Sequence, residues 1–351
     1  MNVQGKVKLR YIRWGFLLLL LLSVGCIMRS SEAGEWYAHF LYPYLSGFLS
    51  RFSSLFPFSV GDCFIYGSIL FLLLYPVYAF IKKQGWWLVA RRMVEYLLWV
   101  YVWFYGAWGL NYFRKDFYSR LEIPRADYSA EVFRSFLIHY TDSLNAAFVS
   151  VDKVDETLIA REVKKGYREI TARFALPHPA DYLRPKPMLM PSLMSGTGVL
   201  GYIGPFFIEY NLNPNLLSVQ YPFTYAHEMA HVLGISNEAE ANLYGFLVCS
   251  RSQVPEIRFS AYFALLPYVL NNAYHLLPKE EFDTWKETLS PAVKALYNDK
   301  VTYWQELYRP LIGELQEISY NWFLKKNNIP SGRKNYSEVV GMLIALSANQ
   351  D

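Results

Sequence analysis

The sequence is poor in cysteine and in charged residues. Its 351 residues include three cysteines, Cys26, Cys63 and Cys249, and none of them forms a C-x-x-C pair. This spacing gives neither a zinc site of paired thiolates nor a C-x-x-C redox motif. Two of the cysteines lie in or next to apolar runs, so a disulfide framework is not expected. Charged residues make up 18% of the chain, below the roughly 25% of soluble proteins. The net charge is only +4, and no basic stripe is interleaved with aromatic residues, so a nucleic-acid-binding protein is not expected.

Apolar residues are abundant instead, and most of them precede residue 114. Hydrophobic residues make up 53% of the chain and aromatic residues 18%. Uncharged runs of nearly membrane-spanning length predict three transmembrane helices, at about residues 14–28, 63–81 and 96–113. A buried hairpin in a soluble domain is the alternative for the last two. The first span either remains as an anchor or is cleaved as a secretory signal, and the poor cleavage site favours an anchor.

The basic residues next to these spans predict their orientation. They gather in two regions, the N-terminus and the loop after the second span: Lys6, Lys8, Arg10, Arg13, Lys82, Lys83, Arg91 and Arg92. Both regions are expected on the cytoplasmic side, which places the chain after Phe113 outside the cytoplasm. The first outer loop, residues 29–62, has helical apolar spacing, and its helix lies on the membrane or packs in the protein core.

The chain from residue 114 to its end has the pattern of a mainly helical domain. Helical spacing is seen at 130–147, 154–174, 223–233, 238–251, 256–275, 279–287, 291–308, 310–327 and 336–347. Between Pro177 and Pro222, short apolar runs separated by proline and glycine predict a small β-sheet. The sequence therefore predicts a membrane region, 1–113, and a globular domain, 114–351.

The five residues from His227 to His231 read H-E-x-x-H, in a chain with six histidines. Residues four apart lie on one face of a helix, so the two imidazoles can bind one zinc ion. Glu228 lies beside that face and is the predicted general base for a zinc-activated water. Thr224 is a candidate N-cap of this helix, and Gly234 is a candidate terminator. Surface histidines on a helix are the alternative interpretation.

A catalytic zinc site needs a third protein ligand and leaves the fourth position for water. Glu238 and Glu240 are the candidates. Asn237 as N-cap and Glu240 would form a capping box, which accounts for Glu240 and favours Glu238 as the ligand. A structural site would recruit a fourth protein ligand, for which Glu240 and Cys249 are nearby.

The sequence also offers candidates for two other parts of a peptidase site, the strand that binds the substrate and the donor that stabilises the oxyanion. The segment Gly204–Asn213 is the candidate edge strand along which a peptide would bind, with an ordinary hairpin as the alternative. The oxyanion of a tetrahedral intermediate also needs a hydrogen-bond donor. Several downstream side chains are suited to that role, and the sequence does not choose among them: His275, Tyr320, Arg333 and Tyr336.

A family resemblance is carried by the segment YAHEMAHVLGISNEAEANLYGFL, which begins at Tyr225. It resembles an uncharacterised bacterial family of membrane-anchored zinc metallopeptidases in which H-E-x-x-H is followed by E-x-E-A-N. Three further segments resemble that family's signatures: PFSVGD from Pro57, WGLNYFR from Trp108 and NYSEVVGMLIAL from Asn335.

The site is also similar to that of the membrane gluzincins, whose E-x-x-A-D motif places its first glutamate on zinc. The resemblance implies that Glu238 is a zinc ligand. Asn242 stands where those proteins have aspartate, so an amide replaces the carboxylate that would orient a histidine.

The residues and the resemblance together predict a gluzincin-like, membrane-bound zinc metallopeptidase in the cytoplasmic membrane of a bacterium. Zinc would be bound by His227, His231 and Glu238, and the expected partners are a protein or peptide substrate and membrane lipid. A catalytically inactive or self-processing sensor or scaffold with a structural zinc site is the alternative. A transporter is disfavoured because no predicted span has an ionisable residue near its centre. The oligomeric state is left open.

Overall fold

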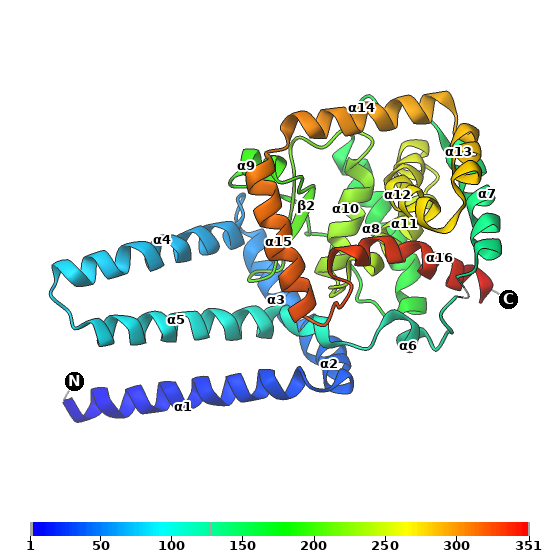
Figure 1. Cartoon of the computed structure of the whole chain (residues 1–351). Helices are drawn as coiled ribbons and strands as arrows, with labels where there is room; N and C mark the ends of the chain where they lie inside the picture. Colours follow the sequence, from blue (N-terminus) through cyan, green and yellow to red (C-terminus); the bar gives the residue numbers. More distant parts are fainter. Residues whose placement is uncertain (1–2, 127, 350–351) are drawn as a thin grey trace. The chain divides into compact units, whose positions relative to one another are not determined.

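The computed structural model describes residues 3–126 and 128–349, and the chain divides into two compact units (Figure 1). The first unit is Met1–Lys115 together with Gly204–Glu209, and the second is Asp116–Ile203 with Tyr210–Asp351. The boundary lies two residues beyond the predicted one at 113. The assignment of the short segment 204–209 to the first unit was not expected from the sequence.

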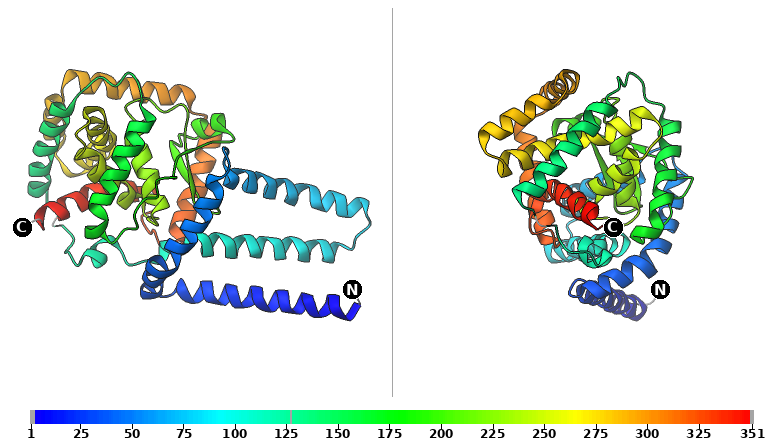
Figure 2. Two further views of the ribbon diagram at one scale, coloured as in Figure 1. Left: turned by 180° about the vertical axis from the view of Figure 1, so that it is seen from behind. Right: turned by 90° about the vertical axis from the view of Figure 1, so that its right-hand side faces the viewer.

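The first unit is built from helices. Its elements are α1 (Val3–Ile27), α2 (Ser31–Trp36), the π-helix η1 (Tyr37–Leu41), α3 (Tyr42–Ser54), α4 (Val60–Ile81), α5 (Trp86–Ala107) and the 3₁₀-helix η2 (Gly109–Phe113). Helix α5 packs against both α1 and α4, and the three helices are seen along their length in Figure 1 and in the left view of Figure 2. The predicted loop 29–62 is thus mostly helical.

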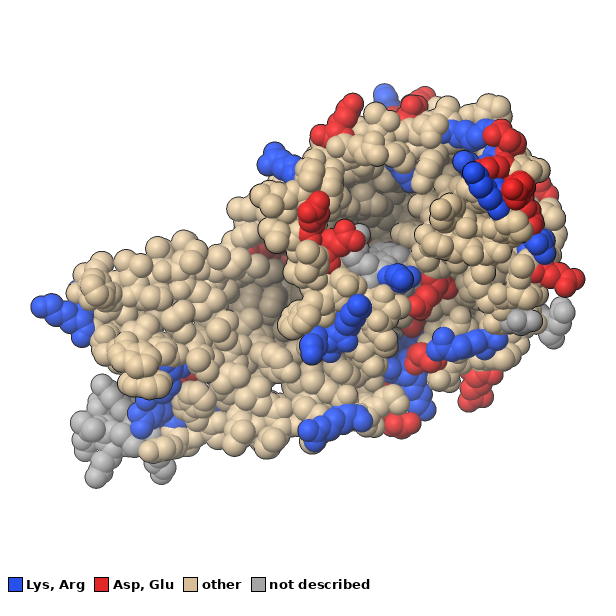
Figure 3. Space-filling view, viewed as in Figure 1, with Lys and Arg blue, Asp and Glu red and all other residues tan. Residues whose placement is uncertain are grey.

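Two helices in the described part of the chain are long and apolar enough to cross a membrane. They are Leu9–Ile27 within α1 and Val60–Ile81, which is α4. Only 6% of the apolar window of α4 is buried, which is not expected of a core helix in a soluble protein. In Figure 3 the surface of α4 and α5 shows few charged side chains along its length. These features indicate membrane association, or a signal sequence in the case of α1.

The prediction of a third span at 96–113 is corrected, because α5 does not qualify. The helix begins at Trp86 and carries Arg91, Arg92 and Glu95 in its first half, and it ends at Ala107. The apolar part that remains, 96–107, is about 18 Å long at 1.5 Å per residue, whereas the hydrocarbon core of a bilayer is about 30 Å thick. The prediction treated the apolar half of α5 and the separate 3₁₀-helix η2 as one continuous apolar helix.

Helix α3 and the segment before it have two apolar faces. Tyr37, Tyr42 and Leu49 are buried within the first unit, whereas Tyr44 and Phe48 are exposed. The amphipathic helix expected in the outer loop is therefore present. One of its faces is buried, as expected of a helix in the protein core, and the other is exposed; contact of that face with a membrane stays a prediction.

The second unit is mainly helical, as predicted, with a small sheet, of which only the end residues Gly204 and Glu209 belong to the first unit. Its elements are α6 (Phe117–Leu121), α7 (Ala130–Ala147), α8 (Glu156–Phe174), β1 (Lys186–Pro187), α9 (Pro191–Gly196), β2 (Gly201–Gly204), β3 (Glu209–Leu212), α10 (Tyr221–Val232), α11 (Glu238–Ser250), α12 (Pro255–Leu276), α13 (Lys279–Thr288), α14 (Pro291–Leu307), α15 (Pro310–Lys326), η3 (Gly332–Glu338) and α16 (Val339–Ala348). Helices α10, α11 and α12 pack against one another, and α7, α8 and α16 pack around them (Figure 2).

The sheet has the strand order β1-β3-β2, with β1 parallel to β3 in the register Lys186↔Asn211 and Pro187↔Leu212. The segment predicted as the edge strand, Gly204–Asn213, therefore begins at the last residue of β2, passes through the hairpin turn and continues as the central strand. The edge strand next to it is β2. The aromatic pair Phe206-Phe207 was expected in a strand and lies in the turn.

The turn between β2 and β3 is held on the N-terminus of α4 within the first unit. Ser59 caps α4 by accepting a hydrogen bond from the backbone N–H of Asp62, and its hydroxyl donates to Glu209 Oε1 at 2.9 Å. The backbone N–H of Gly61 donates to the same oxygen at 2.5 Å. A Cβ on Gly61 would lie 3.0 Å from that oxygen, so the close approach favours glycine. The PFSVGD segment thus binds the hairpin turn.

Candidate metal centre

Helix α10 presents the H-E-x-x-H motif and ends sharply after it. The helix begins at Tyr221, with Pro222 in its first turn, rather than at the predicted cap Thr224. At its other end Gly234 has a φ of +89°. The Gly234 N–H donates to the His231 carbonyl, and the Ile235 N–H donates to the Ala230 carbonyl. This is a Schellman motif, for which glycine in the left-handed region is the favoured residue.

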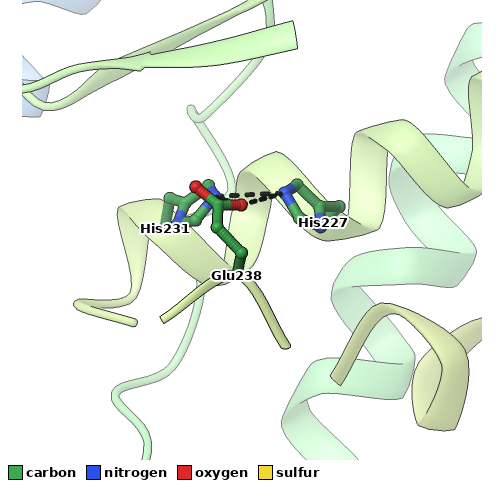
Figure 4. A group of neighbouring side chains, drawn as sticks. All are labelled: His227, His231 and Glu238. Atoms are coloured by element: carbon green, nitrogen blue, oxygen red, sulfur yellow. Dashed lines mark hydrogen bonds and ion pairs between the residues drawn. The ribbon is translucent and has the colours of Figure 1, made fainter. Parts of the chain in front are cut away.

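His227, His231 and Glu238 point toward one another, as Figure 4 shows. The two Nε2 atoms are 3.1 Å apart, and Glu238 Oε2 lies 3.2 Å from His227 Nε2 and 3.4 Å from His231 Nε2. Zinc bonds of about 2.0–2.2 Å at tetrahedral angles place neighbouring donor atoms about 3.3–3.5 Å apart. The three side chains, hereafter the His-His-Glu cluster, therefore have the spacing of three corners of a zinc tetrahedron.

Hydrogen bonding sets the tautomer of one histidine. His231 Nδ1 lies 2.6 Å from the carbonyl oxygen of Ile235 in the turn after α10. A carbonyl only accepts, so Nδ1 carries a proton, and in the neutral form of the ring the Nε2 lone pair faces the cluster, as a metal ligand requires. His227 Nδ1 is buried and has no hydrogen-bond partner within the described part of the chain.

The start of α11 decides between the two candidate glutamates. Asn237 caps the helix as predicted, because its side-chain oxygen accepts from the Glu240 backbone N–H at 3.0 Å. Glu238, in the first turn, points to the histidines. The carboxylate of Glu240 instead forms a buried ion pair with Arg120, which lies in α6. Cys249 is buried and its thiol faces the Pro222 carbonyl.

The set of donor atoms is limited to three. In the described part of the chain, the His-His-Glu cluster is the only group of three or more His, Cys, Asp or Glu side chains whose ligand atoms are close enough for one metal ion. Neither Glu240 nor Cys249 joins it. Three protein ligands with an open fourth position are typical of catalytic zinc, whereas structural zinc has four.

The cluster is buried and electrostatically coupled. Burial alone would raise the pKa of Glu238, but the two histidines hold the pKa of that carboxyl well below its usual range. Burial would lower the pKa of His231, but the neighbouring carboxylates raise it to about 9. A negative carboxylate and two imidazoles thus converge on one point from which water is largely excluded. A divalent cation at that point satisfies all three groups at once.

Glu228, the predicted general base, lies under the edge strand β2. It is 3% exposed, and burial raises its pKa to about 7. A Cβ on Gly201 would come within 2.6 Å of Glu228 Oε1. The absence of a side chain at residue 201 therefore allows the carboxylate to lie against the backbone of β2.

Tyr320 is brought to the cluster from α15. Its hydroxyl donates to Glu238 Oε1 at 2.5 Å, which leaves Oε2 for the metal. His275, another of the four oxyanion candidates, is exposed in the last turn of α12 beside Tyr274. The side chains of Arg333 and Tyr336 lie outside the described residues. The sequence named Tyr320 among four candidates, and it offered no signal that could have selected this tyrosine.

Asn242, which replaces the aspartate of the gluzincin pattern, is 1% exposed on α11. Its Nδ2 atom has no hydrogen-bond partner in the described part of the chain. The resemblance implies that the residue at this position orients a histidine. No described hydrogen bond of Asn242 Nδ2 does so.

The Arg120–Glu240 pair is expected to contribute strongly to stability, because both side chains are nearly buried. Replacing Arg120 with alanine leaves the Glu240 carboxylate without its partner, which typically costs about 3–5 kcal/mol. Thermal unfolding followed by circular dichroism should show a clear drop in melting temperature. The control is Arg161→Ala, which removes the mostly exposed partner of Glu162 and should change little. Equal effects of the two substitutions would contradict the assigned role.

The fold and the His-His-Glu cluster characterise the general class of this protein. It is a mainly helical chain with apolar, membrane-type helices and a buried His-His-Glu group on two adjoining helices. The chain belongs to a family described as a protein of unknown function, DUF3810, whose model matches residues 37–344. No curated protein and no solved structure matches the chain. The family match covers the His-His-Glu cluster and most of both units.

Proposed function

We propose that the chain is a membrane-bound, zinc-dependent metallopeptidase that hydrolyses peptide bonds of protein or peptide substrates. The observation that carries this proposal is the spacing of the His-His-Glu cluster. Its three buried donor atoms are 3.1–3.4 Å apart, and no fourth side chain of the described residues closes the site. Nitrogen and carboxylate donors at this spacing suit zinc.

The residues around the cluster have separate roles in this mechanism. His227, His231 and Glu238 would hold the ion, which would lower the pKa of a water in the fourth position to about 7. Glu228 takes a proton from the attacking water and passes it to the leaving amine. A carboxyl with a pKa of about 7 is suited to both steps near neutral pH.

The backbone of β2 and the hydroxyl of Tyr320 complete the proposed site. A peptide substrate would add as a strand along the outer edge of β2, which brings its scissile carbonyl next to Glu228 below Gly201. Tyr320 orients Glu238 in the free protein. It is also our candidate donor for the negative charge that develops on the carbonyl oxygen.

We further propose that the protein resides in the cytoplasmic membrane of a bacterium, with the cluster on the extracytoplasmic side. The basic residues Lys82 and Lys83 between α4 and α5 favour a cytoplasmic position for that loop. The start of α4, where Ser59 and Gly61 bind Glu209, would then lie on the extracytoplasmic side together with the hairpin that follows Gly201.

The alternative is a sensor or scaffold in which the cluster binds zinc without catalysis. The amide of Asn242, in place of a carboxylate, is the observation in its favour. The three-ligand set supports the peptidase, because a purely structural zinc site has four protein ligands.

Removal of the metal tests the proposal directly. The full chain in nanodiscs is expected to bind one zinc ion and to cleave a fluorescently labelled, casein-type substrate. Treatment with a chelator should reduce cleavage to background, and added zinc should restore it. Magnesium should not restore it, because Mg²⁺ prefers oxygen ligands over imidazole. Bound zinc without cleavage would favour the scaffold, and cleavage that persists in zinc-free protein would exclude a zinc peptidase.

A further inference from the structure

Helix α15 has an unusual second apolar face. Its inner side contains the buried Gly313 and Leu324 and carries Tyr320 to Glu238. Its outer side carries large apolar side chains that are mostly exposed: Leu311 (74%), Leu315 (61%), Ile318 (68%) and Trp322 (63%). These four side chains are hereafter called the outer stripe. No other helix of the second unit has a comparable set among the described residues.

Helical geometry shows that the outer stripe is narrow and continuous. At about 100° per residue, its four members fall within about 60° of one another, on the side opposite Gly313, Tyr320 and Leu324. A face of this kind needs a partner, because large apolar side chains aligned along one side of a helix are unfavourable in water.

The charges around the outer stripe select the kind of partner. Lys325 and Lys326 lie in the last turn next to Trp322, about 50° to either side of the centre of the stripe. The acidic residues lie further round, Glu314 at about 70° and Glu317 at about 130°. An apolar face that ends in tryptophan and is flanked by lysines fits the boundary between acyl chains and anionic headgroups.

The second unit is tethered covalently to the apolar helices of the first. Lys115, the last residue of the first unit before the boundary, is joined directly to Asp116 of the second unit. The second unit is therefore tethered to any membrane in which α4 is embedded. A weak contact between α15 and lipid is then sufficient for docking. The tether keeps the bilayer at a high effective concentration, which reduces the entropic cost of association.

We propose that the outer stripe of α15 is a docking surface for an anionic lipid bilayer. The apolar side chains enter the acyl boundary, and Lys325 and Lys326 contact the headgroups. Because Tyr320 projects from the other side of the same helix, this contact also holds the helix that orients Glu238. The link to catalysis rests on the proposed function, whereas lipid docking does not.

Spin labels measure the position of α15 directly. The full chain, with the exposed Cys26 and Cys63 changed to serine, receives one label at Leu315→Cys or Ile318→Cys. It is reconstituted in nanodiscs of phosphatidylethanolamine and phosphatidylglycerol. Accessibility of the label to oxygen and to a water-soluble nickel complex is then compared. The control label is at Glu306→Cys, an exposed position on α14.

Lipid docking predicts that both α15 labels are accessible to oxygen and shielded from nickel, at a depth of about 5–10 Å below the headgroup boundary. The label at residue 306 should show the reverse. Free access of nickel to residues 315 and 318 would place the stripe in water and overturn the proposal. Low access of both reagents would also overturn it, since a second copy or another protein would then cover the stripe. Neither result depends on peptidase activity, so the test is separate from that of the proposed function.

Discussion

Glu228→Gln is expected to lower the rate of peptide hydrolysis by roughly 10²- to 10⁴-fold, the usual contribution of a general base. The amide has nearly the shape of the carboxylate but cannot accept the proton of the attacking water. The space below Gly201 is already filled by this side chain, so an isosteric change should not disturb the edge strand. Initial rates on a labelled protein substrate, measured with the full chain in nanodiscs, check the prediction.

Zinc content separates a catalytic role of Glu228 from a structural one. Glu228 is not among the three metal ligands, so the variant should keep a full equivalent of zinc. Glu306→Gln, an exposed change on α14, is the matched control and should keep both zinc and activity. If Glu228→Gln cleaves at the wild-type rate, the proposed mechanism is wrong and the scaffold alternative gains support.

His231→Ala is expected to remove the metal. One of three protein ligands is lost, so zinc affinity should fall by more than the 10- to 100-fold typical for loss of an outer-shell partner. After dialysis against a weak chelator the variant should contain almost no zinc by mass spectrometry, and cleavage should disappear with it. His275→Ala, at an exposed histidine of α12, should retain a full equivalent.

The pair of glutamates on α11 provides a sharper comparison for the same prediction. Glu238→Gln removes the carboxylate that faces both histidines and should lower zinc affinity strongly. Glu240→Gln changes the partner of Arg120, so it should lower stability while the folded protein still binds zinc. The opposite result would make Glu240 the third ligand and would contradict the geometry described above.

Local features that act within a few residues made several helices of the second unit predictable. Pro291 and Pro310 mark the starts of α14 and α15, where a missing N–H costs nothing. Asn237 begins α11 by capping its first turn. In each case the residue that marks the helix lies within a few residues of the helix start, so tertiary contacts were not needed to predict the boundary.

The errors arose where composition was read without packing. The apolar half of α5 was joined to η2 and interpreted as a span, because the break at Trp108 has no proline or charged residue to mark it. The apolar run Phe206-Phe207 was assigned to a strand. Its rings instead contact Phe64 and Phe52 in the first unit, and the backbone forms a turn.

The sequence by itself determined the part of this protein that depends on helical periodicity. Four-residue spacing puts His227 and His231 on one face, and Gly234 ends the helix directly after them. Tertiary structure decided the rest of the site. It directed Glu238 rather than Glu240 to the histidines, by pairing Glu240 with Arg120, and it brought Tyr320 to Glu238. Those contacts join residues 120 and 82 positions apart, and no local pattern encodes which distant side chain fills a given buried position.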